Sequence, residues 1–532
     1  MSAGSDKTYY VTTPIYYVND KPHTGHAYTT IACDVVARFK RLDGYDVKFL
    51  TGTDEHGQKV AKAAAEKGVT PQAFTDEVSQ TFNDLTDTLD VTNDDFIRTT
   101  EERHTKACQA LWTRIAGKTA PDGKPWIVLD TYSGWYSVRD EAYHTEDELT
   151  SGPDGTKLAP NGNPVEWVEE ESYFFRLSAA APLLLDYYDA HPDFIAPNSR
   201  RNEVTSFVKG GLRDLSISRT TFDWGVPVPG DDKHVMYVWI DALTNYLTAT
   251  GYPDENAKEY KAFWPADLHM IGKDIIRFHC VYWPAFLLAA GLPLPKRIFA
   301  HGWWTIEGQK MSKSLGNAID PNALIEDYGL DQLRYFLLRE VPFGNDGDFS
   351  KVALIQRANG ELANEFGNLS QRVLSMIHKN CDAKVPSPEE FNDDDAEILV
   401  MAAALLEPVR DAIDRQAFHE ALEIIWTVVR AANAYVDHQA PWVLRKENPA
   451  RMATVLYVLT DVIRMISLIM QPFTPHAAED ILNQLSIPDS QRDFEAFTPG
   501  HAPVPGEDLP KPEPVFQKLE LPEDPVPETA AE

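Results

Sequence analysis

The most constraining feature of this sequence is a strand, a helix and a second strand that follow one another near its start. Residues 9–18 are rich in Thr, Tyr, Val and Ile, which favour strands, and residues 25–42 have a helical pattern. Gly44 then leads into a second strand over residues 47–50. This order predicts a βαβ unit of a parallel sheet, as in doubly wound nucleotide-binding folds, where ligands lie at the carboxyl ends of the strands.

Two histidines stand where the first strand gives way to the helix, in the run Pro22-His23-Thr24-Gly25-His26. Because they are three residues apart at a helix start, both imidazoles can face one way beside the positive end of the helix dipole. Gly25 allows close approach by a flat base. Taken alone, such a pair more often binds a metal or caps the helix than takes part in catalysis. No third ligand lies nearby in the sequence.

A lysine-bearing loop occurs far downstream, in the run Gly308-Gln309-Lys310-Met311-Ser312-Lys313-Ser314-Leu315-Gly316-Asn317. Its glycines permit a mobile backbone, which can bring the ammonium groups of Lys310 and Lys313 to a polyphosphate. The alternative is a solvated basic turn. Residues 310–314 match the KMSKS loop of class I aminoacyl-tRNA synthetases at all five positions. With the HxGH motif upstream, the order of the two motifs resembles the catalytic domain of that class.

The second strand ends in the run Thr51-Gly52-Thr53-Asp54-Glu55-His56-Gly57. Asp54 lies at a carboxyl edge, where a buried carboxylate could receive an ammonium group; the alternative is that it caps a helix beginning near Gln58. Together with the run Tyr16-Tyr17-Val18-Asn19 and the HxGH motif, this segment resembles the methionyl-tRNA synthetases. The resemblance implies that three residues face methionine, with Asp54 holding its amino group: Ile15, Tyr17 and Asp54.

The second half of the catalytic fold shows two further strand patterns. Residues 235–239 are aromatic and β-branched, and residues 267–271 form a second strand that ends in Gly272-Lys273-Asp274. Gly272 frees a turn at the carboxyl edge, and Asp274 could accept hydrogen bonds from ribose hydroxyls there. A helix follows over residues 276–288.

Three residues of this helix region, Ile275, His279 and Trp283, are spaced at i, i+4 and i+8, a stripe that is usually core packing. The resemblance instead implies a pocket for the methionine side chain, and aromatic rings suit a polarizable thioether. Leu243 departs from the proline found in some members of the family. The implied pocket comprises Trp239, Ala242, Leu243, Tyr246, Ile275, His279 and Trp283.

We expect residues 117–222 to form a connective domain inserted between the two halves of the fold. In many methionyl enzymes this insertion carries zinc knuckles built from cysteines, but residues 134–141 contain no cysteine. One alternative is an oxygen-rich metal site that comprises His144, Asp140, Glu141 and Asp147. A solvated acidic turn is favoured over this metal site. We therefore predict no structural zinc. The insertion is short, which disfavours the valyl, isoleucyl and leucyl relatives with their larger editing insertions.

Helical patterns dominate after residue 349 and predict an α-helical bundle; they cover residues 351–379, 395–413, 417–438, 452–470 and 476–485. Asn364, Asn368 and Arg372 recur every four residues, and Trp442 follows Pro441. Such features are usually a solvated face and a packing plug. The resemblance implies that the bundle is the anticodon-binding domain, in which Asn364, Asn368, Arg372 and Trp442 read the CAU anticodon by hydrogen bonding and stacking.

The expected fold class is α/β, a class I synthetase Rossmann-type parallel sheet with an inserted connective domain, followed by an α-helical anticodon-binding bundle. The proline-rich acidic tail is expected to be mostly extended or disordered, with residues 515–519 docking onto the catalytic body. The expected domains are residues 1–116 (first Rossmann half), 117–222 (connective domain), 223–295 (second Rossmann half), 296–350 (KMSKS-bearing linker), 351–500 (bundle) and 501–532 (tail).

Composition limits the partners and the compartment. The chain has 532 residues with a formal net charge of -32, which argues against general nucleic-acid binding but allows local basic patches. Its four cysteines, at 33, 108, 280 and 381, form no CxxC pair, so a reducing cytoplasm is expected. No export signal is recognisable, and the apolar run 455–470 is interrupted by charges, which favours a buried helix. Since some relatives dimerise through an additional C-terminal domain, a monomer is expected.

The reaction that the resemblance implies has two steps. Methionine and ATP give methionyl-adenylate and pyrophosphate, and methionine then passes to the 3′-terminal adenosine of tRNA(Met), including initiator tRNA. Magnesium accompanies ATP. The implied ATP contacts are His23, His26, Lys310 and Lys313 to the phosphates, Gly25 to adenine, Asp274 to ribose, and Gly272 and Ser312 nearby. Two rivals remain, another class I synthetase for a small apolar amino acid and a non-catalytic tRNA-binding relative.

Overall fold

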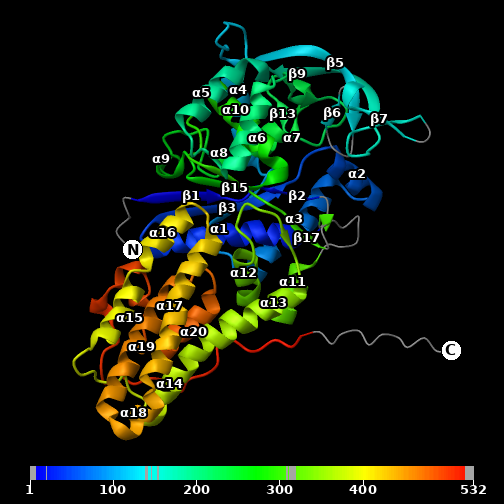
Figure 1. Ribbon diagram of the computed structural model, residues 1–532. Coiled ribbons are helices and arrows are strands. Elements are labelled where there is room, and N and C mark those ends of the chain that lie inside the picture. Colours follow the sequence, from blue (N-terminus) through cyan, green and yellow to red (C-terminus); the bar gives the residue numbers. More distant parts are fainter. Residues whose placement is uncertain are drawn as a thin grey trace, which may run out of the picture. The chain divides into compact units, whose positions relative to one another are not determined.

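The computed structural model describes residues 7–18, 21–137, 142–144, 146–152, 155–306, 309–310 and 319–521 (Figure 1). The chain divides into two compact units, which are described separately. One consists of Thr8–Pro22 and Val47–His301, and the other of Met1–Lys7, His23–Asp46 and Gly302–Glu532. They are called the sheet unit and the helical unit below.

The sheet unit is organised around a seven-stranded sheet in the order β10-β16-β15-β1-β3-β2, with β4 also paired to β3. The pairs β10–β16, β16–β15, β15–β1, β3–β2 and β3–β4 are parallel, which confirms the predicted α/β class. The strands are β1 (Thr8–Thr12), β2 (Tyr16–Tyr17), β3 (Asp46–Asp54), β4 (Asp95–Arg98), β10 (Ile195–Ala196), β15 (Leu268–Gly272) and β16 (Ile298–His301).

Helices of the sheet unit bury one large apolar core. Helix α10 packs against both α4 and α5, and its Trp283, Phe286 and Leu287 are fully buried in this core (Figure 1). Burial of large side chains of this kind contributes roughly 1.5–3 kcal/mol each. The helices are α2 (Gln58–Lys67), α3 (Pro71–Thr88), α4 (Glu102–Ala116), α5 (Leu177–Ala190), α6 (Asn198–Lys209), α7 (Val238–Leu243), α8 (Asn245–Thr248), α9 (Lys258–Phe263) and α10 (Trp283–Ala290).

The region predicted as an insertion holds a separate antiparallel sheet in the order β11-β9-β5-β6. Its long central pair, β5 (Ile127–Ser137) and β9 (Glu166–Phe175), runs antiparallel from the pair Ile127 and Phe175 to the pair Tyr136 and Glu166. The outer strands of this sheet are β6 (Ala142–His144) and β11 (Leu215–Ser216), and the region also holds the pair β7 (Thr150–Ser151) and β8 (Lys157–Leu158). A three-stranded sheet in the order β12-β14-β13 joins β12 (Ser218–Arg219) of this region to β13 (Pro227–Val228) and β14 (Asp231–Met236) beyond it.

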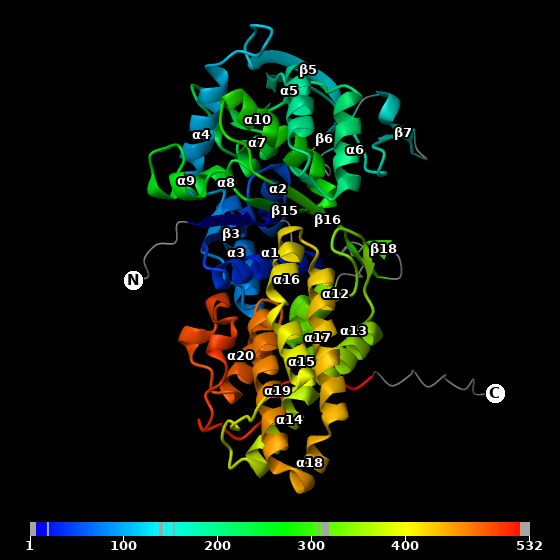
Figure 2. The same ribbon diagram turned by 60° about the vertical axis from the view of Figure 1, so that its left-hand side comes forward.

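The helical unit contains the predicted bundle, in which α15, α17 and α19 pack on one another (Figure 2). It also holds a small sheet of β17 (Trp304–Ile306), β18 (Gln309–Lys310) and β19 (Gly347–Asp348). Its helices are α1 (Thr24–Leu42), α11 (Pro321–Tyr328), α12 (Leu330–Arg339), α13 (Lys351–Arg357), the π-helix η5 (Ala358–Gly367), α14 (Asn368–Asn380), α15 (Asp393–Ala403), α16 (Leu406–Asp414), α17 (Phe418–Gln439), α18 (Pro441–Glu447), α19 (Pro449–Met470) and α20 (Pro475–Gln484).

Helix α1 is tied to the helical unit by buried charges. Asp34 Oδ2 accepts hydrogen bonds from Arg334 Nη2 at 2.6 Å and from Arg38 Nε at 2.7 Å. The side chains of Asp34 and Arg334 are both 0% exposed, and Arg334 also donates to the carbonyls of Pro472 and Phe473. Two further ion pairs hold the C-terminal end of α1, Lys40 with Asp414 at 2.6 Å and Asp43 with Arg410 at 2.7 Å.

Three predicted elements are wrong. The single strand expected over residues 9–18 is two strands, β1, which pairs with β15, and β2, which pairs with β3. The strand expected over residues 235–239 ends at Met236, and α7 begins at Val238 after an extended Tyr237 at the N-cap. The β-branched and aromatic side chains there fill a core position, which a strand or a helix can present equally well. The single helix expected over residues 395–413 is two helices, α15 and α16, which end and begin on either side of residues 404–405.

The apolar run near the C-terminus belongs to α19. Within the described part of the chain, α19 is the one helix long and apolar enough to cross a membrane, and 89% of its apolar window is buried inside the protein. This burial agrees with the prediction of a buried core helix. Asp461 and Arg464, which interrupt the run, pair with each other at 2.7 Å in the interior.

The tail packs where the sequence did not predict. Docking was expected on the catalytic body, but Phe516 is 7% exposed and its ring lies 6.4 Å from that of Phe366 in η5. The Leu519 N–H donates to Asn359 Oδ1 at 2.8 Å, and Asn359 Nδ2 donates back to the Leu519 carbonyl. Residues 515–519 therefore pack on the helical bundle.

Candidate active site

The two histidines of the HxGH motif form the N-terminal cap of α1. His23 is the N-cap residue, and its Nδ1 accepts a hydrogen bond from the Gly25 N–H at 3.0 Å. His26 Nδ1 accepts in turn from the His23 N–H at 3.1 Å, and the two rings stack with centroids 3.9 Å apart. A neutral imidazole that accepts at Nδ1 carries its proton on Nε2. Both histidines therefore have an Nε2–H donor at the positive end of the helix dipole.

The His23 ring lies so close to the backbone at position 25 that this position requires glycine. A Cβ atom at this position would lie 2.8 Å from the His23 ring, too close for a side chain without movement of the imidazole. The glycine thus keeps the His23 ring over the first turn of α1. The predicted contact between Gly25 and adenine stays a prediction.

The segment after the KMSKS motif returns to the HxGH helix. Thr24 Oγ1 donates to the Ile319 carbonyl at 2.7 Å, and the Thr24 N–H donates to the same oxygen at 3.3 Å. At the start of the motif, Lys310 lies in β18 opposite Thr305. Residues 311–318, which include Ser312 and Lys313, lie outside the described residues, as does the side chain of Lys310.

The segment predicted to receive the amino group of methionine ends strand β3. Asp54 is 6% exposed and lies opposite Tyr17 in the pairing of β2 with β3. The alternative that Asp54 caps the next helix is wrong, because the N-cap of α2 is Gly57 and it makes no side-chain cap bond. The neighbouring Glu55 is fixed by Arg98, whose Nε and Nη2 donate to its two carboxylate oxygens at 2.7 and 3.0 Å.

The aromatic residues predicted for the methionine pocket come together around His279. Tyr246 Oη lies 2.7 Å from His279 Nε2, and the ring of Trp283 lies 6.0 Å from that of Tyr246. Trp239 meets the His279 ring edge to face at 6.5 Å and stacks on Phe278 at 3.6 Å. Phe278 was missed, because its place in the sequence lies off the predicted stripe.

The helix that carries this stripe is not regular. Residues Phe278–Tyr282 form a π-helical turn, η3, between the 3-10 turn η2 (Lys273–Ile275) and α10. Such turns are rare in proteins, and those that occur are often found at functional sites. His279 Nδ1 donates to the Ile275 carbonyl at 3.1 Å, so Nε2 accepts from the Tyr246 hydroxyl. Burial lowers the pKa of His279 to about 4, which keeps the ring neutral.

The other predicted pocket residues lie in the same core. Ala242 and Leu243 are buried, whereas Ile15, Tyr17, Trp239 and Ile275 are partly buried against that core. Gly272 ends β15, where a Cβ atom would lie 2.6 Å from Asp274 Oδ1. The Asp274 carboxylate thus folds back over Gly272 at the carboxyl edge of the sheet.

The residues predicted to read the anticodon lie on three helical segments, η5, α14 and α18. Arg372 in α14 lies 5.9 Å from the Trp442 ring centre and pairs with Asp437 at 3.1 Å. Trp442 is 46% exposed at the start of α18, which excludes the packing-plug alternative. Asn364 and Asn368 are also exposed, Asn364 in η5 and Asn368 at the start of α14.

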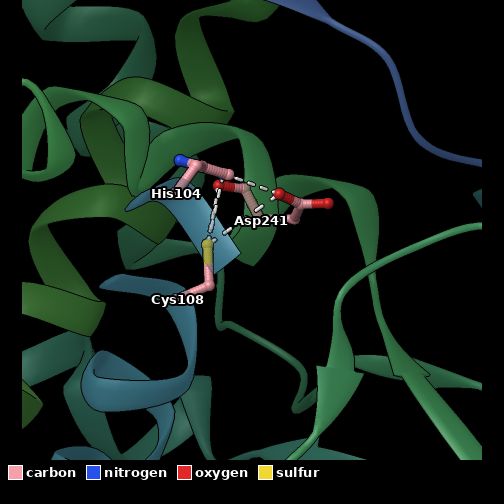
Figure 3. A group of neighbouring side chains, drawn as sticks. All are labelled: His104, Cys108 and Asp241. Carbon is pink, nitrogen blue, oxygen red and sulfur yellow. Dashed lines mark hydrogen bonds and ion pairs between the residues drawn. The ribbon is translucent and has the colours of Figure 1, made fainter. Parts of the chain in front are cut away.

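One buried cluster was not anticipated from the sequence. Asp241 of α7 lies between His104 and Cys108, which are one turn apart on α4, and Figure 3 shows all three converging. Their ligating atoms lie within 4.8 Å of one another, the one such grouping of metal-binding side chains among the described residues. The i, i+4 spacing of His104 and Cys108 was a usable signal, but nothing local points to Asp241.

Comparison with known proteins decides the family. Residues 9–374 match the model described as class I tRNA synthetases (M), and residues 385–525 match the anticodon-binding domain of methionyl tRNA ligase. This chain belongs to the methionyl-tRNA synthetases. The methionine–tRNA ligase of Brucella suis is 56% identical over 97% of this chain and 98% of that relative. That of Mycobacterium bovis is 56% identical over 98% of this chain and 99% of that relative.

Solved structures agree with this membership. A Mycobacterium tuberculosis methionyl-tRNA synthetase in complex with methionyl-adenylate has a TM-score of 0.91 at 56% identity, covering 96% of this chain and 99% of that one. The apo form of the Mycobacterium tuberculosis enzyme has a TM-score of 0.87 at 51% identity, covering 98% of this chain and 100% of that one. The chain is therefore a methionine–tRNA ligase, which uses ATP to activate methionine and transfers it to the 3′-terminal adenosine of tRNA(Met).

Proposed function

We propose that His23, His26, Lys310 and Lys313 act together on the triphosphate of ATP as methionine attacks the α-phosphate. The observation that carries this assignment is the double hydrogen bond from Thr24 to the Ile319 carbonyl. It joins the residue after His23 to Ile319, just beyond the KMSKS motif, which supports a common role for the two motifs at the start of α1. Positioning and charge stabilisation can then supply most of the acceleration without a covalent nucleophile.

The two histidines contribute as hydrogen-bond donors. Their Nδ1 atoms accept from backbone N–H groups of the cap, so their Nε2–H groups suit phosphate oxygens, which only accept. The N-terminus of α1 adds its backbone N–H groups and the positive end of its dipole. Lys310 and Lys313 add positive charge as the negative charge develops. The magnesium ion enters as part of the MgATP substrate.

The remaining ATP contacts are assigned by motif. Gly25 lies against adenine, and Asp274 accepts hydrogen bonds from the ribose hydroxyls at the edge that Gly272 leaves open. Ser312 lies in the loop that approaches the phosphates.

Methionine is proposed to lie between Asp54 and the aromatic residues around His279. Asp54 holds the amino group, and the rings of Trp239, Tyr246 and His279 contact the thioether, for which sulfur–aromatic contacts contribute about 0.3–1.5 kcal/mol each. The neutral state of His279 suits an apolar ligand. The full set of proposed methionine contacts is Ile15, Tyr17, Asp54, Trp239, Ala242, Leu243, Tyr246, Ile275, His279 and Trp283. Methionyl-adenylate, the ligand of the Mycobacterium tuberculosis complex, is the proposed intermediate.

The anticodon of tRNA(Met), including the initiator, is proposed to bind at Asn364, Asn368, Arg372 and Trp442. Trp442 is exposed and lies beside the Arg372 guanidinium, so a base can stack on the indole while Arg372 supplies hydrogen bonds to base edges or phosphate. The two asparagines add amide donors and acceptors on the adjoining helical segment.

We further propose a monomer in a reducing cytoplasm without structural zinc, with the domain boundaries given above. Three of the four cysteines are buried as free thiols and the fourth, Cys381, is half-buried, which suits a reducing compartment. Size-exclusion chromatography with light scattering tests the oligomeric state, and elemental analysis tests the zinc prediction. A dimer at micromolar concentration, or one zinc per chain, would contradict these parts.

Amino-acid-dependent ATP–pyrophosphate exchange tests the site. Wild-type protein should exchange with methionine and not with valine, isoleucine, leucine or cysteine, and Lys313→Ala should lower the exchange kcat by about 100-fold or more, the size expected for lost transition-state charge stabilisation. An unchanged rate in Lys313→Ala would remove this lysine from the phosphate site. The control is Lys351→Ala, an exposed lysine at the start of α13, which should leave exchange unchanged.

A further inference from the structure

A fully buried carboxylate joins two parts of the sheet unit near the proposed methionine pocket. Asp241 Oδ2 lies 2.7 Å from His56 Nδ1, and Asp241 Oδ1 lies 2.8 Å from His104 Nε2. Asp241 and His104 are 0% exposed, and His56 is 7% exposed. An ionised carboxylate only accepts hydrogen bonds, so both imidazole nitrogens that face it are donors.

The surrounding contacts fix His104 from its other side. Thr248 Oγ1 of α8 lies 3.0 Å from His104 Nδ1. Cys108 Sγ lies 3.2 Å from His104 Nε2 and 3.7 Å from the Asp241 carbonyl (Figure 3). Burial raises the pKa of the Cys108 thiol well above its ordinary value, so sulfur is present as a thiol. His104 and Asp241 are thus each held by more than one polar contact.

Asp241 and His56 are both close in sequence to proposed methionine contacts. Asp241 lies in α7 between Trp239 and Ala242, two of the proposed contacts of the methionine side chain. His56 follows Asp54, the proposed amino-group ligand, by two residues at the end of β3. The Asp241–His56 hydrogen bond therefore ties the helix that carries the thioether side of the pocket to the strand end that carries its ammonium side.

We propose that Asp241 is a positioning residue for methionine, which acts through His56 and His104 to set the distance between Asp54 and Trp239. The inference rests on the proposed roles of those two residues. Because each carboxylate oxygen takes one imidazole from a different element, Asp241 is fixed in two directions, and α7 can shift only if a buried hydrogen bond breaks. Trp224 supports the arrangement from outside, since its Nε1–H donates to the Glu55 carbonyl at 2.6 Å.

The test compares Asp241→Asn with wild type in ATP–pyrophosphate exchange, measuring KM for methionine and for ATP separately. The amide turns an N–H group toward one imidazole donor, which breaks that hydrogen bond while keeping the volume. We expect KM for methionine to rise by about tenfold or more, with KM for ATP within about twofold and kcat within about threefold. The matched control is Asp461→Asn, which removes another buried carboxylate, that of the Asp461–Arg464 pair in α19. It should lower the melting temperature and leave both KM values unchanged.

Variants of His56 keep the inference testable if Asp241→Asn fails to fold. His56→Leu should raise KM for methionine in the same selective way. His56→Asn, whose amide N–H can take the place of Nδ1–H, should return it to within about threefold of wild type, which a purely structural loss would not do. Equal changes in both KM values, or a lowered melting temperature with KM for methionine unchanged, would overturn the proposal.

Two further measurements separate the remaining outcomes. A metal ion bound at one per chain in wild type and lost in His104→Gln would overturn the hydrogen-bonding role. If Asp54→Asn and Trp239→Ala leave KM for methionine unchanged, the proposed site itself fails. If those two raise KM and Asp241→Asn does not, the positioning role alone fails.

Discussion

Replacing Asp34 by asparagine tests the anchoring of the HxGH helix. Asp34 and Arg334 are both 0% exposed, and their atoms lie 2.6 Å apart. Asp34→Asn keeps one oxygen that can accept a hydrogen bond, but it removes the buried negative charge that faces the Arg334 guanidinium, which also donates to the carbonyls of Pro472 and Phe473. Removing one member of a buried ion pair typically costs about 3–5 kcal/mol.

The lost free energy should appear as a lower melting temperature of the helical unit, by about 6–20 °C at roughly 2–4 °C per kcal/mol. Differential scanning calorimetry measures this change, and hydrogen exchange should show faster exchange of α1 amides. The control is Arg38→Gln, which removes a partner whose side chain is 19% exposed and should cost about 1 kcal/mol or less.

A double variant sharpens the test. Asp34→Asn combined with Arg334→Met leaves no uncompensated charge, so its cost should be less than the sum of the two single costs by about 2 kcal/mol or more. Strictly additive costs, or an Asp34→Asn variant within about 1 kcal/mol of wild type, would show that the pair does not hold α1.

Four further predictions follow from single contacts. Thr24→Val removes the 2.7 Å bond to the Ile319 carbonyl and should lower kcat/KM for ATP by about 3–10-fold in pyrophosphate exchange; Thr24→Ser should restore it. Tyr246→Phe leaves His279 Nε2 without its donor at 2.7 Å and should raise KM for methionine by about 5–100-fold, and no change would remove Tyr246 from the pocket. Because the folded-state pKa of His279 is about 4, below the ordinary value, the unfolded state binds protons first as pH falls. The free energy of unfolding should therefore fall by about 2 kcal/mol from pH 7 to pH 5 through His279 alone. Denaturant unfolding at both pH values should show that His279→Gln lacks this pH dependence. Trp442→Ala should leave methionine activation near wild type and reduce tRNA charging by about 5-fold or more, and equal loss in both assays would mark Trp442 as structural.

The sequence allowed most of the sheet unit to be predicted, because its signals are local. The strand ending at Asp54 and the helix starting at Thr24 occur close to where their patterns placed them. The histidine pair at the start of α1 was also recognisable within five residues, although its capping of the helix was only one of the alternatives considered. The strand predicted over residues 235–239 was wrong in its second half, since a short apolar run fits a buried strand and a buried helix alike.

Other features depend on contacts between distant residues. The π-helical turn at Phe278–Tyr282 changes which side chains share a face, so Phe278 could not be placed beside Trp239 by counting in steps of four. The network of Asp241 joins residues 137 and 185 positions apart in the chain. No periodicity can indicate such a contact, because it exists only when three separate elements have packed.

The ion pairs of helix α1 affect how the enzyme folds during synthesis and where it can be divided into fragments. This helix is translated between the first strands of the sheet, yet the arginine that neutralises Asp34 follows 300 residues later. During synthesis, Asp34 of the HxGH helix therefore lacks its buried counter-charge, Arg334, until α12 has left the ribosome. A fragment ending near residue 301 keeps the histidines and loses Arg334, Asp414 and Arg410, which pair with Asp34, Lys40 and Asp43. Split-protein designs should therefore keep α1 with residues 302–521.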